Sequence, residues 1–577
     1  MQQIFIPDAS TTGTVTYQVV VGGQVANPTY ELQSMVITRE TNRIPSARLT
    51  FKDGDPSQKT FAMSEQSPFI PGASIVLQLG RGGNNTQVFK GIVIRHAIRV
   101  KENGQSELTV DCRDETIRMT VGRHSKYFLK VFDSDVMNTL VTGYPDLTCT
   151  VNPTTLKFEE LVQNHVTDWD FLLLRAEANG LLVNVVDGAV QINAPTTNNP
   201  PALTVAFGSS VLEFEAEMDA RNQWSNVEAR SWDYHSQKLF QADVSSVSNW
   251  QEAGNIPGST LAQTIKLQNF ELNHSGYLTE LELNNWATGQ MARSALAKIC
   301  GRAKCDGFAN INPGNMLTVT GVGARFNGNV YVTAVRHEVG NGMWDTHVQF
   351  GLNARRYAEL FADVDDRAAA GLIGGIRGLQ IGVCAQLQGD PDGQGRILVR
   401  LPIIDNTNLT NGVWTRVASL DAGKNRGSFF MPEVNDEVIV GFINDDPRQA
   451  VLLGMVNSSA NPAAWQPTTD NNTKGFQSRS KMQFTFDDGN LQLTLTTQNG
   501  NQIQFDDNAG SITLQDQNQN KIQMNSNGIT INSPTTITLQ APNIALTGTT
   551  GLTVKAPTAT VTATGPLTMK GVPVAIN

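Results

Sequence analysis

The fold is decided by residues 501–532, which read NQIQFDDNAGSITLQDQNQNKIQMNSNGITIN. Apolar residues occur here in pairs whose members stand two positions apart, as do side chains on one face of a strand. Successive pairs begin seven to ten residues apart and continue toward the C-terminus: Ile503/Phe505, Ile512/Leu514, Ile522/Met524, Ile529/Ile531, Ile537/Leu539, Ile544/Leu546 and Leu552/Val554. This spacing predicts a repeat of short strands.

Each repeat unit offers only two apolar side chains, so a single chain would enclose a very thin core. The last 52 residues, Ser526 to Asn577, contain two charged residues, Lys555 and Lys570. Repeats of this kind gain stability by stacking on neighbours. We therefore predict that residues 481–577 form a C-terminal intertwined trimeric β-helix, or β-prism, that acts as a needle. A disordered tail is the alternative, but disordered tracts lack regular apolar pairs.

The composition indicates a protein of several domains that is mainly β. The chain has 577 residues, of which 50 are glycine and 24 are proline. Its net charge of −10 would become −30 in a trimer (3 × −10), which disfavours binding to nucleic acid or anionic membranes. The N-terminus lacks the basic start of a signal peptide, so we expect synthesis in the cytoplasm. Five cysteines at irregular spacing predict free thiols.

A second repeat lies upstream. Pro71-Gly72 and Pro313-Gly314 each precede an apolar strand, a Phe-x-Gly turn, an Arg-His pair and a Gly-led strand, about 240 residues apart. We predict a hub region, residues 1–367, with two similar β-barrel subdomains at about 1–130 and 200–357, in which His96 and His337 are equivalent. Three chains would then present six similar units, which suits a junction between three-fold and six-fold objects. Chance recurrence of turn residues is the alternative.

Other segments indicate helical inserts and linkers. Thr167 is expected to cap a helix that ends at Gly180, and a hairpin with an Asp187-Gly188 turn should follow. A further helix is expected from about Gly289 to Ala303. A Gly/Ala linker at 368–378, a compact β domain at 379–457 and a connector at 458–480 complete the predicted organisation.

The β domain at 379–457 resembles a known family through ordered segments: Gly395-Arg-Ile-Leu-Val-Arg-Leu-Pro402, Trp414-Thr-Arg-Val-Ala418, Gly427-Ser-Phe-Phe-Met-Pro-Glu-Val434, Asp436-Glu-Val-Ile-Val-Gly-Phe442 and Leu452-Leu-Gly-Met-Val456. They are similar to the OB-fold domain of VgrG-type spike proteins of contractile injection systems, which include type VI secretion systems, phage tails and extracellular phage-tail-like particles. Residues 168–192 and 224–233 are similar to the hub of the same family. The likeness spans about residues 1–560.

The resemblance implies a homotrimeric central spike whose hub lies beneath a hexameric inner tube in the baseplate. Such a spike is driven through a target envelope, delivers cargo, and often carries a PAAR-type tip and noncovalently attached effectors. The particle that contains it would be cytoplasmic, membrane-attached or released. The connector at 458–480 leaves no room for the lysozyme-like domain of some phage members, so we expect no enzymatic activity.

No catalytic chemistry emerges from the motifs. The seven histidines form no HExxH motif, and no phosphate loop or nucleophile elbow is present, so we predict no catalytic residue, cofactor or metal site. Asp390, Asp392, Asp445 and Asp446 are interpreted as turn residues. Residues 378–456 carry six Lys/Arg against nine Asp/Glu, and we expect Trp414, Phe429, Phe430 and Phe442 to pack in the core, so no nucleic-acid site is predicted.

A trimeric β-helical tailspike or adhesin that binds or degrades surface polysaccharide is the alternative function. It should carry paired carboxylates along its shaft, whereas residues 526–577 contain no Asp or Glu. Alternating Val572, Val574 and Ile576 near the C-terminus are the candidates for docking a tip protein.

Overall fold

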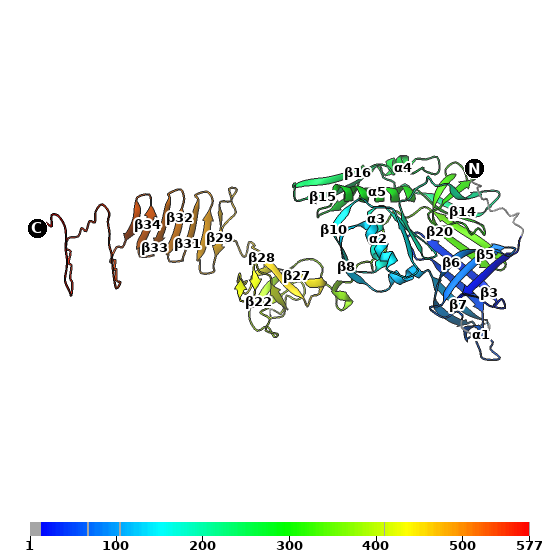
Figure 1. The fold of residues 1–577 in the computed structure, drawn as a ribbon, viewed down its shortest axis with the longest axis horizontal. Coiled ribbons are helices and arrows are strands. Elements are labelled where there is room, and N and C mark those ends of the chain that lie inside the picture. Colours follow the sequence, from blue (N-terminus) through cyan, green and yellow to red (C-terminus); the bar gives the residue numbers. More distant parts are fainter. Residues whose placement is uncertain (1–12, 66–67, 103–104, 409, 576–577) are drawn as a thin grey trace. The chain divides into compact units, whose positions relative to one another are not determined.

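The computed structural model describes residues 13–65, 68–102, 105–408 and 410–575 (Figure 1). The chain divides into two compact units, Met1–Leu372 and Ile373–Asn577. Strands dominate both units, and helices occur almost entirely in the first. The chain is therefore mainly β, as the composition predicts.

The first hub unit is an antiparallel arrangement of six main strands. Its sheet order is β1-β5-β6-β7-β4-β3. The strands are β1 (Val15–Val21), β3 (Leu32–Glu40), β4 (Ser46–Lys52), β5 (Ser74–Arg81), β6 (Asn84–Val100) and β7 (Ser106–Arg113), with the short β2 (Gln24–Val25) and α1 (Ala62–Glu65) beside them. Alternate residues along these strands are buried, and they form one core that includes Met35, Leu49, Phe51, Leu77 and Phe89.

The second hub unit repeats this order as β13-β19-β20-β21-β18-β14. Its strands are β13 (Pro201–Ala206), β14 (Val211–Met218), β18 (Ile299–Asp306), β19 (Met316–Thr320), β20 (Gly328–Gly340) and β21 (Met343–Phe350). They surround a separate core that includes Leu203, Ala303, Leu317, Val348 and Phe350. One pairing differs, because β13 and β19 are parallel whereas β1 and β5 are antiparallel.

Details of hydrogen bonding show that the two units are true structural repeats. The Gly72 N–H donates to the Val93 carbonyl at 2.8 Å, and the Gly314 N–H donates to the Val332 carbonyl at 2.9 Å. A register shift follows Val93 in the β6–β7 pair and Val332 in the β20–β21 pair. A second matched shift lies between Leu32 and Ser34 in β3–β4 and between Val211 and Glu213 in β14–β18. Shared bulges at shared places are retained features of a fold and not accidents of turn residues.

The matched bulges correct one expected equivalence. They align β6 with β20 at a displacement of 239 residues, since 332 less 93 is 239. His337 therefore matches Ile98, and His96 lies two residues away from the equivalent position. The Arg-His motifs do not mark equivalent positions, because Gly72 and Val93 are 21 residues apart (93 less 72) whereas Gly314 and Val332 are 18 residues apart (332 less 314).

The two hub units are joined edge to edge. β3 pairs with β20 in antiparallel register from Glu40↔Ala334 to Ser34↔Gly340, so both units share one 13-stranded sheet. The Thr41 N–H extends this ladder by donating to the Thr333 carbonyl at 2.8 Å.

Helical inserts flank the sheet. α3 (Asp168–Ala178) begins at the predicted cap, where the Thr167 hydroxyl accepts a hydrogen bond from the Asp170 N–H, and the predicted hairpin forms as β11 (Leu182–Val186) and β12 (Ala189–Asn193). The predicted bounds of the later helix, about 289–303, are wrong: α5 spans Glu280–Ala297, and residues 299–306 form β18. The remaining hub elements are η1 (Glu115–Thr120), β8 (His124–Phe132), α2 (Asp133–Thr142), β9 (Thr148–Val151), β10 (Lys157–Val166), β15 (Val227–Asp233), β16 (Lys238–Val244), α4 (Gly258–Ile265), β17 (Phe270–His274), α6 (Tyr357–Leu360) and η2 (Ala368–Gly371).

The second compact unit begins with a closed five-stranded barrel, the architecture of an OB fold. Its strands are β22 (Gln380–Gln386), β23 (Ile397–Arg400), β24 (Val413–Val417), β27 (Glu437–Phe442) and β28 (Ala450–Met455), with a small hairpin of β25 (Ala422–Gly423) and β26 (Arg426–Gly427) and the turn η3 (Ile443–Asp445). Cys384, Val399, Val438, Val440 and Leu452 form its core. Phe442 packs against this core as expected.

The C-terminal ladder is a seven-stranded antiparallel sheet in which each strand pairs with the next along the chain (Figure 1). Its strands have five residues each: β29 (Thr473–Gln477), β30 (Gln483–Asp487), β31 (Gln492–Thr496), β32 (Gln502–Asp506), β33 (Ser511–Gln515), β34 (Lys521–Asn525) and β35 (Gly528–Asn532). Residues 533–575 form no strand or helix in the single chain. The predicted pairs from Ile503/Phe505 to Ile529/Ile531 are therefore confirmed as strand residues, and the three later pairs lie beyond the ladder.

Candidate functional site

The candidate site is one face of the C-terminal ladder, where apolar side chains line up from strand to strand. In each of β30 to β35 the second and fourth residues are apolar and the other three are polar or glycine, so both apolar residues lie on the same face. The register places them directly opposite one another in two columns: Phe484–Leu495–Ile503–Leu514–Ile522–Ile531 and Phe486–Leu493–Phe505–Ile512–Met524–Ile529.

These two apolar columns are not covered by the chain itself. Ile503, Leu514 and Ile522 are each 37–38% exposed, and exposure rises to 55% at Ile531 and 69% at Ile529. The ladder is a single layer, and no other strand or helix in the described part of the chain contributes to its sheet. A continuous apolar strip on a soluble protein marks a surface that another molecule covers.

The ladder is anchored to the barrel by stacked aromatic rings. Phe430, which follows the β25–β26 hairpin, stacks on Phe476 of β29 with ring centroids 5.5 Å apart, and Phe476 in turn stacks on Phe484 at 6.5 Å. An ion pair between Arg479 and Glu433, 2.9 Å, bridges the same two regions. The expectation that Phe429 and Phe430 pack in the barrel core is wrong: they are 81% and 60% exposed. They follow the last residue of a hairpin that projects from the barrel, where strand periodicity gives no information on burial.

The candidate tip residues lie at the far end of the chain. Val572 is fully exposed and Val574 is 46% exposed, whereas Ile576 lies outside the described residues. Both valines are available for contact with another molecule.

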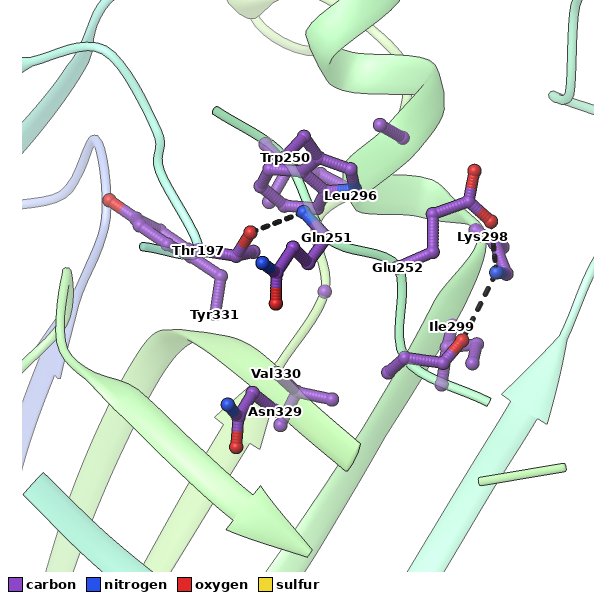
Figure 2. A pocket seen from close by; sticks show the side chains of 13 residues that line it. Thr197, Trp250, Gln251, Glu252, Leu296, Lys298, Ile299, Asn329, Val330 and Tyr331 are labelled. Atoms are coloured by element: carbon purple, nitrogen blue, oxygen red, sulfur yellow. Dashed lines mark hydrogen bonds and ion pairs between the residues drawn. The ribbon is translucent and has the colours of Figure 1, made fainter. Parts of the chain in front are cut away.

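The hub contains a small cavity between α5 and the strands of the second hub unit (Figure 2). Its volume of about 30 Å³ suits one or two water molecules. The Lys298 side chain is buried here, forms an ion pair with Glu252 and donates to the Ala253 carbonyl at 3.1 Å. The Gln251 N–H donates to the Thr197 hydroxyl at 2.5 Å. These contacts hold the 250–253 segment against the hub, which is a structural role.

The shifted pKa values of Asp390 and Cys305 have structural causes. Asp390 accepts hydrogen bonds from the Arg396 guanidinium and three backbone N–H groups, which hold the pKa of its carboxyl well below the usual range. All five cysteines are free, as predicted, and burial raises the pKa of Cys305 to about 12. Across the described ranges, no cluster of three or more His, Cys, Asp or Glu is arranged to hold a metal ion. None of the helices that the structure describes is long and apolar enough to cross a membrane.

Comparisons with protein families match all three parts of the chain. A model described as the Alg8 N-terminal domain matches residues 11–341, which is more than half of the chain. A type VI secretion system/phage-baseplate injector OB domain matches residues 380–456, the five-stranded barrel. A phage baseplate V C-terminal trimerisation domain matches residues 492–550, which include most of the two apolar columns.

Individual relatives match over shorter lengths. The chain is 31% identical over 110 residues to the type VI secretion system spike protein VgrG1a of Pseudomonas aeruginosa, covering 18% of this chain and 17% of the relative. It is 37% identical over 76 residues to VgrG3 of Vibrio cholerae, covering 13% of this chain and 8% of the relative. The chain thus spans less than a fifth of the length of these curated relatives.

Solved structures align over longer stretches of the chain at lower sequence identity. A 43 kDa tail protein of prophage MuSo2 from Shewanella oneidensis aligns with a TM-score of 0.46 and 14% identity, over 59% of this chain and 99% of that one. One chain of a Francisella PdpA-VgrG complex aligns with a TM-score of 0.38 and 9% identity, over 90% of this chain and 80% of that one.

Proposed function

Because the chain belongs to the family of the Alg8 N-terminal domain and is a VgrG-type spike protein, we propose that it forms the homotrimeric central spike of a contractile injection machine. In this role it adapts a three-fold needle to a six-fold inner tube in the baseplate and punctures the target envelope to deliver cargo. The protein is made in the cytoplasm and acts as part of an assembled particle.

The observation that carries the proposal is the pair of uncovered apolar columns on the ladder. Burial of an aliphatic or aromatic side chain contributes about 1.5–3 kcal/mol, so completing the burial of half-exposed residues contributes about 1 kcal/mol each. Nine of the twelve column residues are more than one-third exposed, and together they would contribute about 10 kcal/mol of burial per copy before the costs of association. Three ladders that turn their apolar faces toward a common axis bury all of these residues.

Residues 533–575 fit the same arrangement. They continue the two-apolar spacing of the ladder but form no strand in the single chain. Their backbone groups need partners if they are to be buried, and two further copies wound about the axis would supply them. In the trimer we expect these residues to extend the needle.

The repeated hub supports the symmetry adaptation. Two units of the same strand order in each chain give six in a trimer, and a hexameric tube requires six similar contact surfaces. Baseplate components and the inner tube protein are therefore the partners expected at the hub. The proposed role is mechanical and needs no catalysis, and effectors would attach noncovalently.

The distal end is proposed to hold a PAAR-type tip. Val572 and Val574 are exposed, and three copies of each would form an apolar end with Ile576 beyond them. Deletion of residues 571–577 should abolish binding to such a tip protein in a pull-down. Undiminished binding by the shortened chain would show that the tip docks elsewhere.

The trimer is tested by sedimentation equilibrium at micromolar concentration. The wild-type chain of 62.6 kDa should sediment as a trimer of three times that mass. Leu514→Asp places a charge in an apolar column and should shift the chain toward the monomer, whereas Gln523→Asp, on the polar face of the neighbouring strand, should leave the trimer intact. A folded wild-type monomer would overturn the proposal.

A further inference from the structure

The internal joint between the two hub units defines how a second copy would attach. Inside one chain, the outer edge of β3 in the first unit pairs with β20 of the second unit over seven residue pairs. By the matched bulges, β14 is the equivalent of β3 and β6 is the equivalent of β20. A repeat of the same joint would pair β14 of one copy with β6 of another.

Both strands of this second joint have an open edge. β14 ends the strand order of the sheet, and within the described residues it pairs with β18 alone. β6 pairs with β5 only up to Ile92, and from Val93 to Val100 its single strand partner in the described chain is β7. An unpaired edge presents backbone donors and acceptors that another strand can use.

On both open edges, the residues whose backbone N–H and C=O groups point outward are the ones that this joint would pair. The Lys101 N–H donates to the Gln105 carbonyl, so the backbone groups of Lys101 point toward β7. Because successive residues of a strand point their backbone groups to opposite sides, those of residues 96, 98 and 100 point toward the open edge. The Asp219 N–H donates to the Lys298 carbonyl, so residues 214, 216 and 218 of β14 do the same. These are the residues that the internal joint would bring together.

We propose that β14 of one copy pairs antiparallel with residues 95–101 of a second copy, and that this contact closes the hub ring. The proposal rests on the trimeric spike proposed above and adds the surface that joins its hubs. The register follows from the β3–β20 pairs: adding 179 to a β3 residue number gives the β14 residue, and subtracting 239 from a β20 number gives the β6 residue. In this register Glu215 lies opposite Arg99, Glu213 opposite Lys101 and Asp219 opposite Arg95.

The charges across this joint are complementary. One face of β14 carries Glu213, Glu215 and Glu217, and the facing row of β6 carries Arg95, Arg99 and Lys101. The side chain of Arg99 is 72% exposed and that of Glu215 is 84% exposed, and among the described residues each has a distant ion-pair partner, Glu107 at 4.0 Å and Arg302 at 3.9 Å. In the joint they would complete an alternating row of Glu107, Arg99, Glu215 and Arg302, in which every charge lies beside the opposite sign.

The opposite face of the joint is apolar. Ile98 and Val100 of β6 are 51% and 68% exposed, although both lie within a regular strand. In the transferred register they face Ala216 and Phe214, which pack against the core of the second hub unit. A second copy therefore covers exposed aliphatic side chains and completes the backbone ladder together. Because the two surfaces differ, the contact is heterologous, and repeated contacts close into a ring when the rotation fits.

Disulfide cross-linking of the full-length protein tests the register. Ala97 and Glu217 are equivalent to Arg336 and Thr38, a pair without mutual hydrogen bonds, whose Cα atoms lie about 4.5 Å apart in an antiparallel ladder. This separation permits a disulfide. The variant Ala97→Cys/Glu217→Cys should give covalent dimers and closed trimers on oxidation in non-reducing gels. The shifted pair Ala97→Cys/Glu213→Cys, about 13 Å out of register, should not.

A charge exchange provides an independent readout on the same cross-link. Adding Arg99→Glu to the first pair should slow disulfide formation at least fivefold, and adding Glu215→Arg as well should restore it. The pairing would be overturned if the shifted pair formed disulfides as fast as Ala97→Cys/Glu217→Cys. It would also be overturned if neither Arg99→Glu nor Glu215→Arg changed the rate of disulfide formation. A trimer by sedimentation without any cross-link would overturn this joint but leave the spike proposal intact, whereas a monomer would remove both.

Discussion

Phe430 stacks on Phe476 with ring centroids 5.5 Å apart and an interplanar angle of 17°, which ties the barrel hairpin to the first strand of the ladder. The chain between these residues includes a long stretch without strands, from Val456 to Asn472. The stacked rings and the Arg479–Glu433 ion pair bridge the barrel and the ladder across this connector. The proposed puncturing role would require such a junction to be stiff.

Replacement of Phe430 by alanine should loosen this junction. An aromatic pair contributes about 0.5–1.5 kcal/mol, so the connector should open about 2 to 10 times more often. Limited proteolysis at residues 458–472 should accelerate by that factor. Phe429→Ala removes a neighbouring phenylalanine that is more exposed and stacks on no ring in the described structure, and it should cleave at the wild-type rate. Equal acceleration in both variants would show that the stack does not restrain the connector.

The sequence predicted the ladder well because its periodicity is local. Pairs such as Ile512/Leu514 need only the alternation of a strand to share a face, and the structure places them so. The predicted equivalence of His96 and His337 is wrong because strand register depends on bulges and loop lengths, which a short motif does not reveal. The open edges of β6 and β14 could not be predicted at all, since an edge is a property of the assembled sheet.

The start of α5 is marked in the sequence by a capping box that the prediction missed. Thr279 and Glu282 form a capping box at the start of α5: the Glu282 N–H donates to the Thr279 hydroxyl at 3.2 Å, and the Thr279 N–H donates to the Glu282 carboxylate at 2.8 Å. The spacing of Ser/Thr and Glu by three is the sequence signature of a helix N-terminus. The end was placed too late because residues 299–305 contain Ala, Lys and Cys, which do not exclude a helix.

Thr279→Ala should destabilise the hub. Loss of an N-cap side chain costs about 1 kcal/mol, and the buried Leu283, Ala287 and Met291 of α5 belong to the core that α5 forms with the sheet of β15, β16 and β17. Urea unfolding followed by hub fluorescence should show this decrease, and Thr279→Ser should recover most of it. Asn284→Ala, at an exposed position inside the same helix, should cause no loss. A stability unchanged by Thr279→Ala would mean that the helix start is held by packing alone.

His337 should make the hub sensitive to acid. Its ring is fully buried, with Nδ1 3.1 Å from the Thr346 hydroxyl, and Nε2 has no hydrogen-bond partner among the residues that the structure describes. Burial lowers the pKa of His337 from 6.5 to about 3, and the nearby positive charges of Arg39 and His347 act in the same direction. Between pH 3 and 6.5 the unfolded chain therefore binds a proton at this site that the folded chain does not. Stability contributed by the neutral ring is complete above pH 6.5 and is lost as the pH falls below it.

The expected loss at pH 5 is about 2 kcal/mol, since pH 5 lies 1.5 units below the unfolded pKa and each unit corresponds to about 1.4 kcal/mol. His337→Leu should reduce the difference in unfolding free energy between pH 7 and pH 5 by this amount, whatever its effect on absolute stability. His124→Leu, at an exposed position in β8, should leave the difference unchanged. The free energy lost with the packing of the ring is the same at both pH values and cancels in this difference. The contribution of proton binding differs between pH 7 and pH 5, so it remains. The same pH response in His337→Leu and wild type would show that other groups govern acid sensitivity.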